Sequence, residues 1–449
     1  MNKIPNYTLV LLFGLIFIGC KKKTISDDSI KPPVSGPTSP HKTYFVSANS
    51  GSDINIGLVQ TSAFRTLQKA ASVTSPGDTV LIMNGVYSST SGPLLTINRS
   101  GSDGKYITYK AMKNNTPKLT AGGNVWDAII IDAAFIVFEG LDLEGDNANL
   151  TLAGAQASYQ QSRATPAVFN ANFNTNCISI GKSNPAHHIV IKNCKVHDFP
   201  AGGVGIGNAD YVTVEGNTVY NNSWYTMYAT SGISILGPKP IDAVTGYKMI
   251  IRGNTVYGNK TQVFWRTPSG NDRLSDGNGI IIDANNGTQG TTVYTGRTLI
   301  ENNVSYNNGG SGIHTFQAGR VDIVNNTAYN NGNVVGYAEI FAQQGVDVKI
   351  MNNIMYARTG GNCNANDASG TYNYNIYFNG PSFRAGSNDR VINPQFISLS
   401  TNPTIANFSL QAGSPAINAG TQILFAAKDI LGVARPKGGA VDIGAYEVN

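Results

Sequence analysis

The sequence predicts an all-β protein, a single-stranded right-handed parallel β-helix with an N-terminal capping helix. Three observations predict this fold. A short alternating segment, with Asn at its fourth position and an aromatic residue at or near its seventh, recurs along the middle of the chain. A second alternating strand precedes most copies, and no long helical pattern interrupts the series. Such self-similarity is typical of solenoids, in which each coil contacts only its neighbours.

Residues 1–19 precede the repeats and predict a secretory signal. Lys3 gives a basic start, Leu9–Ile18 is almost entirely apolar, and the small residue Gly19 precedes Cys20. These three features in this order are typical of an export signal. The apolar run is shorter than the roughly 20 residues that a membrane span needs.

Ile18-Gly19-Cys20 resembles the lipobox of bacterial lipoproteins. The resemblance implies cleavage before Cys20 and lipidation of its thiol, so that the membrane is contacted through the lipid anchor alone. Asp27 and Asp28 follow soon afterwards and resemble a surface-export signal of outer-membrane lipoproteins. Lys31–Lys42 is rich in Pro, Ser and Gly, and residues 20–42 are therefore expected to form an extended tether. We therefore expect an exported protein, anchored in the outer membrane and displayed at the cell surface.

The remaining residues, 43–449, are expected to form one β-helix domain with a cap at each end. The net charge of the chain is only +5, and no cluster of Lys and Arg is interleaved with aromatic residues, so no nucleic-acid partner is expected. Cys177, Cys194 and Cys363 are scattered and odd in number, which does not suit a disulfide framework. We expect a monomer.

The repeated segment predicts two columns of stacked side chains. An Asn side chain can bond a turn backbone and the Asn of the adjacent coil, so a buried turn keeps its polar groups satisfied. The expected asparagine column is Asn217, Asn254, Asn303, Asn326 and Asn353. The expected tyrosine column is Tyr220, Tyr257, Tyr306, Tyr329 and Tyr356. Both columns are interpreted as structural.

The strand before the repeated segment sets the two faces of each coil, since alternate side chains of a strand point to opposite sides. The expected strands are 177–181, 203–207, 232–236, 279–283 and 312–316. Side chains expected to point inward are Ile178, Val204, Ile233, Ile280 and Ile313. Side chains expected to point outward are Ser179, Gly205, Ser234, Ile281 and His314.

The two ends of the series differ from its middle, as solenoid caps do. Near the start, a strand from Thr43 is followed by the amphipathic segment Phe64–Ala71, which predicts a short helix over the open end of the core. Near the end, Ser414–Gly420 and Asp442–Tyr446 resemble the tail of many bacterial β-helix proteins.

Residue types suited to carbohydrate chemistry gather between positions 265 and 339, in an inserted loop and the coils beside it. An exposed Trp can stack on a sugar ring, Arg can pair with a uronate carboxylate, and carboxyl groups or His can transfer protons. Adjacent coils lie about 4.8 Å apart, so such groups can converge on one ring. The candidates are Trp265, Arg266, Asp272, Arg273, Asp276, Asp283, His314 and Glu339.

Taken together, the repeats and the caps resemble the pectate-lyase-like β-helix superfamily over nearly all of the mature chain, and polysaccharide lyase family nine in particular. That family binds Ca²⁺ through an Asp cluster and uses a Lys as its base. The resemblance implies Asp272, Asp276 and Asp283 as metal ligands. The spacing differs from the family pattern, the adjacent double Asp is missing, and His314 stands where the Lys is expected.

We therefore expect a carbohydrate-active enzyme, a polysaccharide lyase that cleaves a uronate-containing glycan by β-elimination with Ca²⁺ as cofactor. Three functions remain open at this point: this lyase, a glycoside hydrolase that uses two of the carboxyl groups, and a non-catalytic glycan-binding protein. Fold alone cannot choose between them. The expected catalytic residues are His314, Asp276, Asp283 and Arg266, and the expected substrate-binding residues are Trp265, Arg273 and Glu339.

Overall fold

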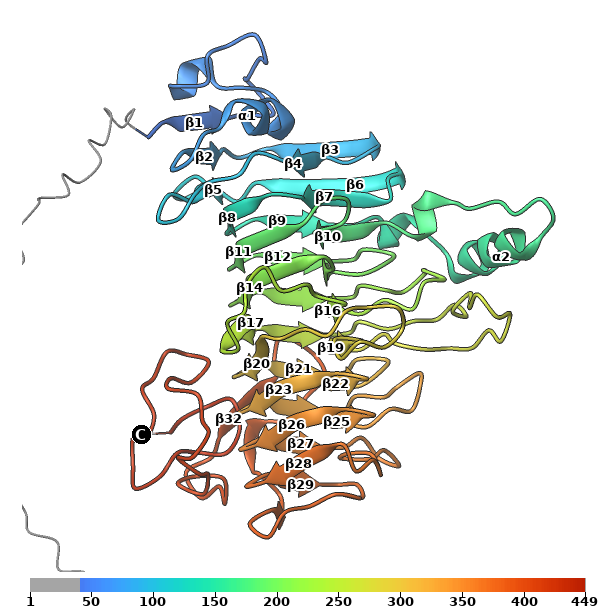
Figure 1. Cartoon of the computed structure of the whole chain (residues 1–449), viewed down its shortest axis with the longest axis vertical. Coiled ribbons are helices and arrows are strands. Elements are labelled where there is room, and N and C mark those ends of the chain that lie inside the picture. Colours follow the sequence, from blue (N-terminus) through green and yellow to red (C-terminus); the bar gives the residue numbers. More distant parts are fainter. Residues whose placement is uncertain (1–40, 449) are drawn as a thin grey trace, which may run out of the picture. The chain divides into compact units, whose positions relative to one another are not determined.

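The computed structural model describes residues 41–448, so Cys20 and the expected signal and tether lie outside the described residues, apart from His41 and Lys42. The strands form three long parallel sheets, stacked coil upon coil around one core (Figure 1). Each coil contributes one strand to each sheet over most of the length. The expected right-handed parallel β-helix is confirmed.

We call the three sheets A, B and C. Sheet A consists of β1 (Thr43–Val46), β2 (Thr79–Ile82), β5 (Ile107–Ala111), β8 (Ala134–Glu139), β11 (Ala186–Lys192), β14 (Ala209–Glu215), β17 (Tyr247–Arg252), β20 (Arg297–Glu301), β23 (Gly319–Val324), β26 (Val346–Met351) and β28 (Gly370–Asn373). Sheet B consists of β3 (Val86–Ser91), β6 (Lys118–Asn124), β9 (Asp142–Glu144), β12 (Lys195–His197), β15 (Thr218–Tyr220), β18 (Thr255–Tyr257), β21 (Val304–Tyr306), β24 (Thr327–Tyr329), β27 (Ile354–Tyr356), β29 (Ile376–Phe378) and β30 (Arg390–Val391). Sheet C consists of β4 (Leu95–Ile97), β7 (Asp127–Ile131), β10 (Asn176–Ile180), β13 (Val204–Ile206), β16 (Ile233–Leu236), β19 (Ile280–Asp283), β22 (Ile313–Phe316) and β25 (Ile340–Gln343).

Sheet C confirms the expected faces of the coils. The five residues expected to point inward pair in register from β10 to β22, and all of them are fully buried. Burying one such aliphatic side chain contributes about 1.5–3 kcal/mol, so the column is a large part of the core. On the outer face, Ser179, Gly205 and Ser234 are in register with Ile281 and His314.

The asparagine column is confirmed and forms a continuous ladder of hydrogen bonds. Each Nδ2 donates to the Oδ1 of the next coil at 2.9–3.1 Å, from Asn217 through Asn353 to Asn375. The ladder ends at Asp389, whose carboxylate accepts from the backbone N of Asn375 at 2.7 Å. A second ladder, not expected from the sequence, is formed by Asn222, Asn259, Asn308 and Asn331.

The tyrosine column is confirmed only in its first part. Tyr220, Tyr257 and Tyr306 stack with ring centroids 4.9–5.0 Å apart. Beyond them, Phe408 contacts the rings of both Tyr306 and Tyr329, at 5.1 and 5.6 Å. Phe408 belongs to β32 (Asn407–Leu410), which pairs antiparallel with β31 (Phe396–Ser398) in the C-terminal segment that packs on sheet B. This segment therefore interrupts the stack that the repeat alone predicts.

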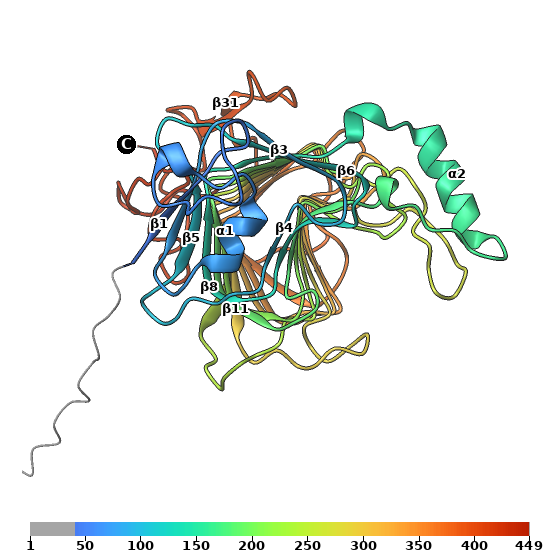
Figure 2. The ribbon, with the colours of Figure 1, turned by 90° about the horizontal axis from the view of Figure 1, so that it is seen from above.

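The capping helix is confirmed as α1 (Leu67–Val73), which lies across the first coils when the β-helix is viewed along its axis (Figure 2). Thr66 caps it by accepting from the backbone N of Lys69, and Leu67, the first residue of the helix, is buried in the core. The sequence did not predict α2 (Leu152–Arg163), which projects from the β-helix in an insertion between β9 and β10 (Figures 1 and 2). Three short 3-10 helices complete the described elements: η1 (Gln60–Ser62), η2 (Asn147–Asn149) and η3 (Ala171–Phe173). Neither α-helix within residues 41–448 is long and apolar enough to cross a membrane.

Candidate functional site

A pocket of about 630 Å³ lies on the outer face of sheet C, over β19, β22 and β25. Five of the residues predicted from the sequence line it, and the inserted loop 264–279 forms one wall. The predicted residues are Trp265, Arg273, Asp276, Asp283 and His314. The other lining residues are Tyr228, Ala229, Leu236, Ser275, Ile281, Gln289, Phe316, Gln317, Tyr337, Gln343 and Gln344. Five of the eight residues proposed from the sequence therefore lie together in one pocket.

Asp276 is held in a constrained turn at the edge of this pocket. Its backbone φ is +62°, a left-handed conformation that is uncommon outside glycine, and Gly277 follows at +67°. The carboxyl group accepts from Ser275 Oγ at 2.9 Å and from Asn278 Nδ2 at 3.1 Å. Burial, with a smaller contribution from the charge of Asp283, raises the pKa of Asp276 to about 7.

Asp283 is the last residue of β19 and supplies the second carboxyl group of the pocket. It pairs in register with Phe316 of β22. Gln289 Nε2 donates to its Oδ1 at 3.0 Å, and burial raises the pKa of Asp283 to about 6. Two carboxyl groups in one pocket thus have raised pKa values, which is the electrostatic requirement for acid–base work near neutral pH.

His314 lies in the floor of the pocket, on β22. Its side chain faces outward as expected, but the surrounding loops leave the residue only 4% exposed. The ring stacks on Phe341 with centroids 4.1 Å apart, and Tyr337 lies against it at 5.6 Å. Neither ring nitrogen makes a hydrogen bond. The nearby side chain of Gln343 favours the protonated imidazole of His314, but this effect is smaller than that of burial. Burial lowers the pKa of His314 to about 3, so the imidazole is neutral at physiological pH.

Arg273 and Trp265 are held side by side in the inserted loop. An isolated β-bridge joins them, with the backbone N of Trp265 donating to the carbonyl of Arg273 at 2.7 Å. The guanidinium carbon lies 4.9 Å from the centre of the Trp265 ring. Arg273 is the only Lys or Arg that lines the pocket, and it makes no ion pair within residues 41–448. It is therefore available to a negatively charged ligand.

Asp272 does not join the other carboxyl groups, which corrects the expected metal cluster. Its carboxylate forms an ion pair with Arg163 of α2 and accepts from the hydroxyl of Tyr159 at 2.5 Å. Burial alone would raise the pKa of Asp272, but Arg163 and Tyr159 hold it well below its usual range. In the part of the chain that the structure describes, no three His, Cys, Asp or Glu side chains come together as a metal site. The residues present therefore do not fit a three-Asp calcium site.

Arg266 and Glu339 are also placed differently from the prediction. Arg266 does not line the pocket; its Nε donates to the carbonyl of Ser162 at 3.1 Å, and its guanidinium lies 5.2 Å from the ring centre of Phe169. Glu339 is only 1% exposed, and its carboxylate accepts from the backbone N and Nδ2 of Asn331 at 2.8 and 2.5 Å. Glu339 thus ends the second asparagine ladder and is structural.

Tyr337 and Gln289 are two of the eleven lining residues that the sequence did not predict. Tyr337 lies between His314 and Ser275, with its hydroxyl 3.5 Å from Ser275 Oγ. Gln289 begins a row of side-chain contacts to Gln317 and Gln344 along the rim. Both residues lie in turns between coils. In the sequence, only their proximity to predicted residues could have indicated that they line the pocket.

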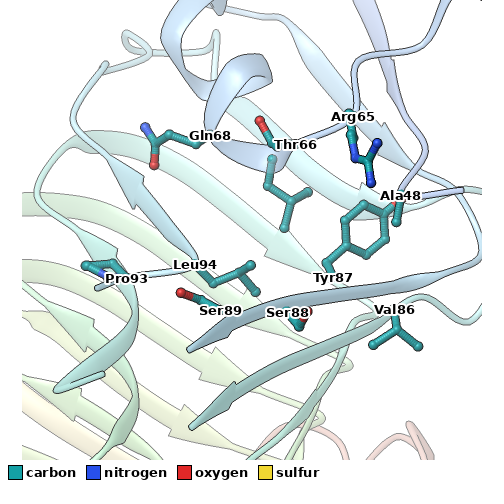
Figure 3. A pocket seen from close by; sticks show the side chains of 11 residues that line it. Ala48, Arg65, Thr66, Gln68, Val86, Tyr87, Ser88, Ser89, Pro93 and Leu94 are labelled. Atoms are coloured by element: carbon teal, nitrogen blue, oxygen red, sulfur yellow. The ribbon is translucent and has the colours of Figure 1, made fainter. Parts of the chain in front are cut away.

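A second hollow, of about 380 Å³, lies between α1, β3 and β4 (Figure 3). Arg65, Thr66, Gln68, Ser88 and Ser89 are its polar lining residues. It contains no carboxyl group and no His, so it offers no acid–base pair. Of these two hollows, only the pocket over sheet C holds candidate acid–base groups, and we take it as the candidate active site.

Comparisons with known proteins agree with the architecture. The family described as "Pel9A-like, right handed beta helix region" matches residues 44–353. Among solved structures, pectate lyase Pel9A is similar, with a TM-score of 0.57 and 18% identity over 92% of this chain and 98% of that chain. A rhamnogalacturonan lyase has a TM-score of 0.43 and 16% identity, covering 80% of this chain and 91% of the other. The GH136 lacto-N-biosidase from Eubacterium ramulus has a TM-score of 0.46 and 15% identity, covering 75% and 60%. No curated protein sequence matches.

Proposed function

This chain belongs to the Pel9A-like right-handed β-helix family, and we propose that it is a polysaccharide lyase acting on a uronate-containing glycan. One observation carries the proposal. Asp276 and Asp283, with pKa values raised to about 7 and about 6, share a pocket with an unpaired Arg273. The lyase activity named for one similar structure agrees with this reaction class.

The reaction needs a base, an acid and a positive charge. In β-elimination the base removes the proton at C5 of the uronate, the electron pair forms the C4–C5 double bond, and the C4–O bond breaks. The departing oxygen takes a proton. Arg273 pairs with the uronate carboxylate and stabilises the charge that develops on it. Trp265, which holds Arg273, presents an aromatic surface to the sugar ring.

The order of the two pKa values indicates which carboxyl group is the base and which is the acid. Asp283, with the lower pKa of about 6, is the first to be ionised and acts as the base. Asp276, with a pKa of about 7, holds its proton longer and donates it to the departing oxygen. Between these values both roles are filled at once. The two groups titrate as a coupled pair, because the charge of Asp283 acts on Asp276.

His314 is assigned a different role from the base expected from the sequence. A buried imidazole with a pKa of about 3 is a weak base. Because both ring nitrogens lack partners, we assign it to hydrogen bonding with a hydroxyl of the bound sugar. No step of this mechanism uses Ca²⁺. A rise in melting temperature on addition of Ca²⁺, abolished in Asp276→Asn, would restore the metal to the mechanism.

A glycoside hydrolase is the second candidate, because paired carboxyl groups with raised pKa values also suit glycosidic hydrolysis. Incubation with polygalacturonate, alginate and rhamnogalacturonan separates the possibilities. A lyase produces the ultraviolet absorbance of an unsaturated uronide together with new chain ends. New reducing ends without that absorbance would show a hydrolase. Glycan binding with neither product would leave a binding protein and overturn both enzymatic assignments.

A further inference from the structure

An exposed cluster of aromatic side chains lies next to the candidate active site. Trp126, Phe169 and Tyr228 are 38%, 45% and 41% exposed. The rings of Trp126 and Tyr228 meet edge to face with centroids 6.2 Å apart. Tyr228 also lines the pocket that contains Asp276 and Asp283. The cluster is therefore continuous with that pocket.

Arg266 adds a positive charge to this cluster. Its guanidinium lies over Phe169, and its charge acts on the pKa of Tyr228 in the direction opposite to burial. Within residues 41–448, its only side-chain hydrogen bond is from Nε to Ser162. Both Nη groups remain free, which is the end of an Arg side chain that pairs with a carboxylate in a two-point contact.

Trp126 lies toward the N-terminal end of the β-helix from the pocket. It directly precedes β7 and contacts Tyr228 in the loop before β16, whereas the pocket lies mainly over β19, β22 and β25. Between them, the outer face of sheet C carries the short side chains of Ser179 and Ser234 and the bare backbone of Gly205. A Cβ built on Gly205 would meet only one atom within 4 Å, the carbonyl oxygen of Ile178 at 3.8 Å. This face leaves room for a chain that runs along the coils.

We propose that Trp126, Phe169, Tyr228 and Arg266 form a second sugar-binding subsite, which binds a further uronate residue of the same acidic glycan. The proposal rests on the proposed function, because it takes the ligand to be a chain whose reacting residue occupies the pocket. The aromatic rings contact the sugar, and Arg266 pairs with its carboxylate. Tyr228 marks the boundary between the two sites, and a sugar held by Trp126, Phe169 and Arg266 lies beyond the pocket, so the subsite governs affinity for long chains and not the chemical step.

Calorimetric binding with oligogalacturonates of graded length tests the subsite directly, in chains that carry Asp283→Asn to prevent turnover. We expect Trp126→Ala and Arg266→Gln each to weaken binding of long oligosaccharides about tenfold and to leave the shortest ones unchanged. Arg266→Gln should also remove any preference for native chains over chains whose carboxyl groups have been reduced to alcohols. Phe383→Ala and Arg65→Gln are the matched controls, since Phe383 and Arg65 are exposed and lie outside both sites.

The outcomes separate this subsite from the proposed function. The subsite is overturned if a variant with an unchanged melting temperature binds oligosaccharides of every length equally more weakly, or binds all of them as tightly as the parent chain. In that case the lyase assignment stands if the unaltered chain still produces the unsaturated product. If the parent chain does not bind oligogalacturonates, the subsite is overturned for that glycan. If the unaltered chain forms no product from any of the three polymers, the proposed lyase function is overturned as well.

Discussion

Asp276 and Asp283 are carboxyl groups that line the candidate active site and have pKa values well above those of surface Asp residues. Both are half-buried, and the pKa of each is raised mainly by that burial. Both line the pocket over sheet C. Together these features separate the pair from Asp272, which has the same residue type in the same loop but is neutralised by Arg163.

Removing either carboxyl group is expected to abolish most of the activity. Asp276→Asn and Asp283→Asn should each lower kcat by about 10²–10⁴-fold, the usual contribution of a positioned acid or base. The unaltered enzyme should show a bell-shaped profile of kcat/KM centred between about 6 and about 7. Asp103→Asn, at an exposed position, is the control. Activity of both pocket variants within a factor of two or so of the control would remove the pair from the mechanism.

His197 carries a pH-dependent part of the stability. Burial alone would lower its pKa, but the carboxylates of Asp142 and Asp198, at 2.8 and 2.7 Å, raise the pKa to about 9. A His with a raised pKa in the folded state adds stability below its unfolded pKa of about 6.5, and this stability is lost as the pH rises through 9. His197→Phe keeps a ring on Tyr220 without the charge. The variant should lose up to about 3 kcal/mol of unfolding free energy near pH 6 and little near pH 10, by urea denaturation. A pH-independent loss would contradict this origin.

At the scale of elements, the repeat made part of the molecule predictable. The asparagine ladder followed from the repeat because identical residues at identical positions must stack when coils stack. The tyrosine column followed in the same way until Phe408, which lies outside the repeat, contacted Tyr306 and Tyr329. The roles of Asp272 and Glu339 could not be predicted. Asp272 is paired with Arg163, which lies 109 positions away in the sequence. Glu339 accepts a hydrogen bond from Asn331, the last residue of a ladder that was not expected.

The asparagine ladder should be costly to interrupt. Asn303 is fully buried; its Oδ1 accepts from Asn254, and its Nδ2 donates to Asn326. Asn303→Ala leaves these neighbours without partners, and each unsatisfied buried group costs about 1–3 kcal/mol. We expect a loss of about 3 kcal/mol or more in unfolding free energy, measured by chemical denaturation. Asn184→Ala, at an exposed position outside both ladders, should change it by less than about 0.5 kcal/mol. Equal effects would show that the ladder adds no stability.

The α2 insertion positions the loop that carries the candidate site. Arg163 pairs with Asp272 and donates to the carbonyl of Thr267 at 2.8 Å, so it ties the helix to the segment between Trp265 and Arg273. Arg163→Met should free this loop, raise KM more than it lowers kcat, and speed proteolytic cleavage between residues 264 and 276. Gln160→Ala, exposed on the same helix, is the control. A fall in kcat alone, with unchanged proteolysis, would show that the ion pair does not act through the loop.

At the scale of the whole molecule, the β-helix carries the candidate active site on the outer face of sheet C, and the sequence predicts a lipid-anchoring signal before the β-helix. Because Cys20 lies outside the described residues, the anchor is tested in cells and not by geometry. We propose an outer-membrane lipoprotein whose only membrane contact is the lipid on Cys20. Cys20→Ser should move the protein from the membrane fraction to the soluble fraction and end its labelling by a fatty-acid analogue, with the activity of the purified chain unchanged. Cys363→Ser, at a buried cysteine of the β-helix, should leave the labelling intact. Membrane retention of the unlabelled Cys20→Ser chain would show that another part of the molecule binds the membrane.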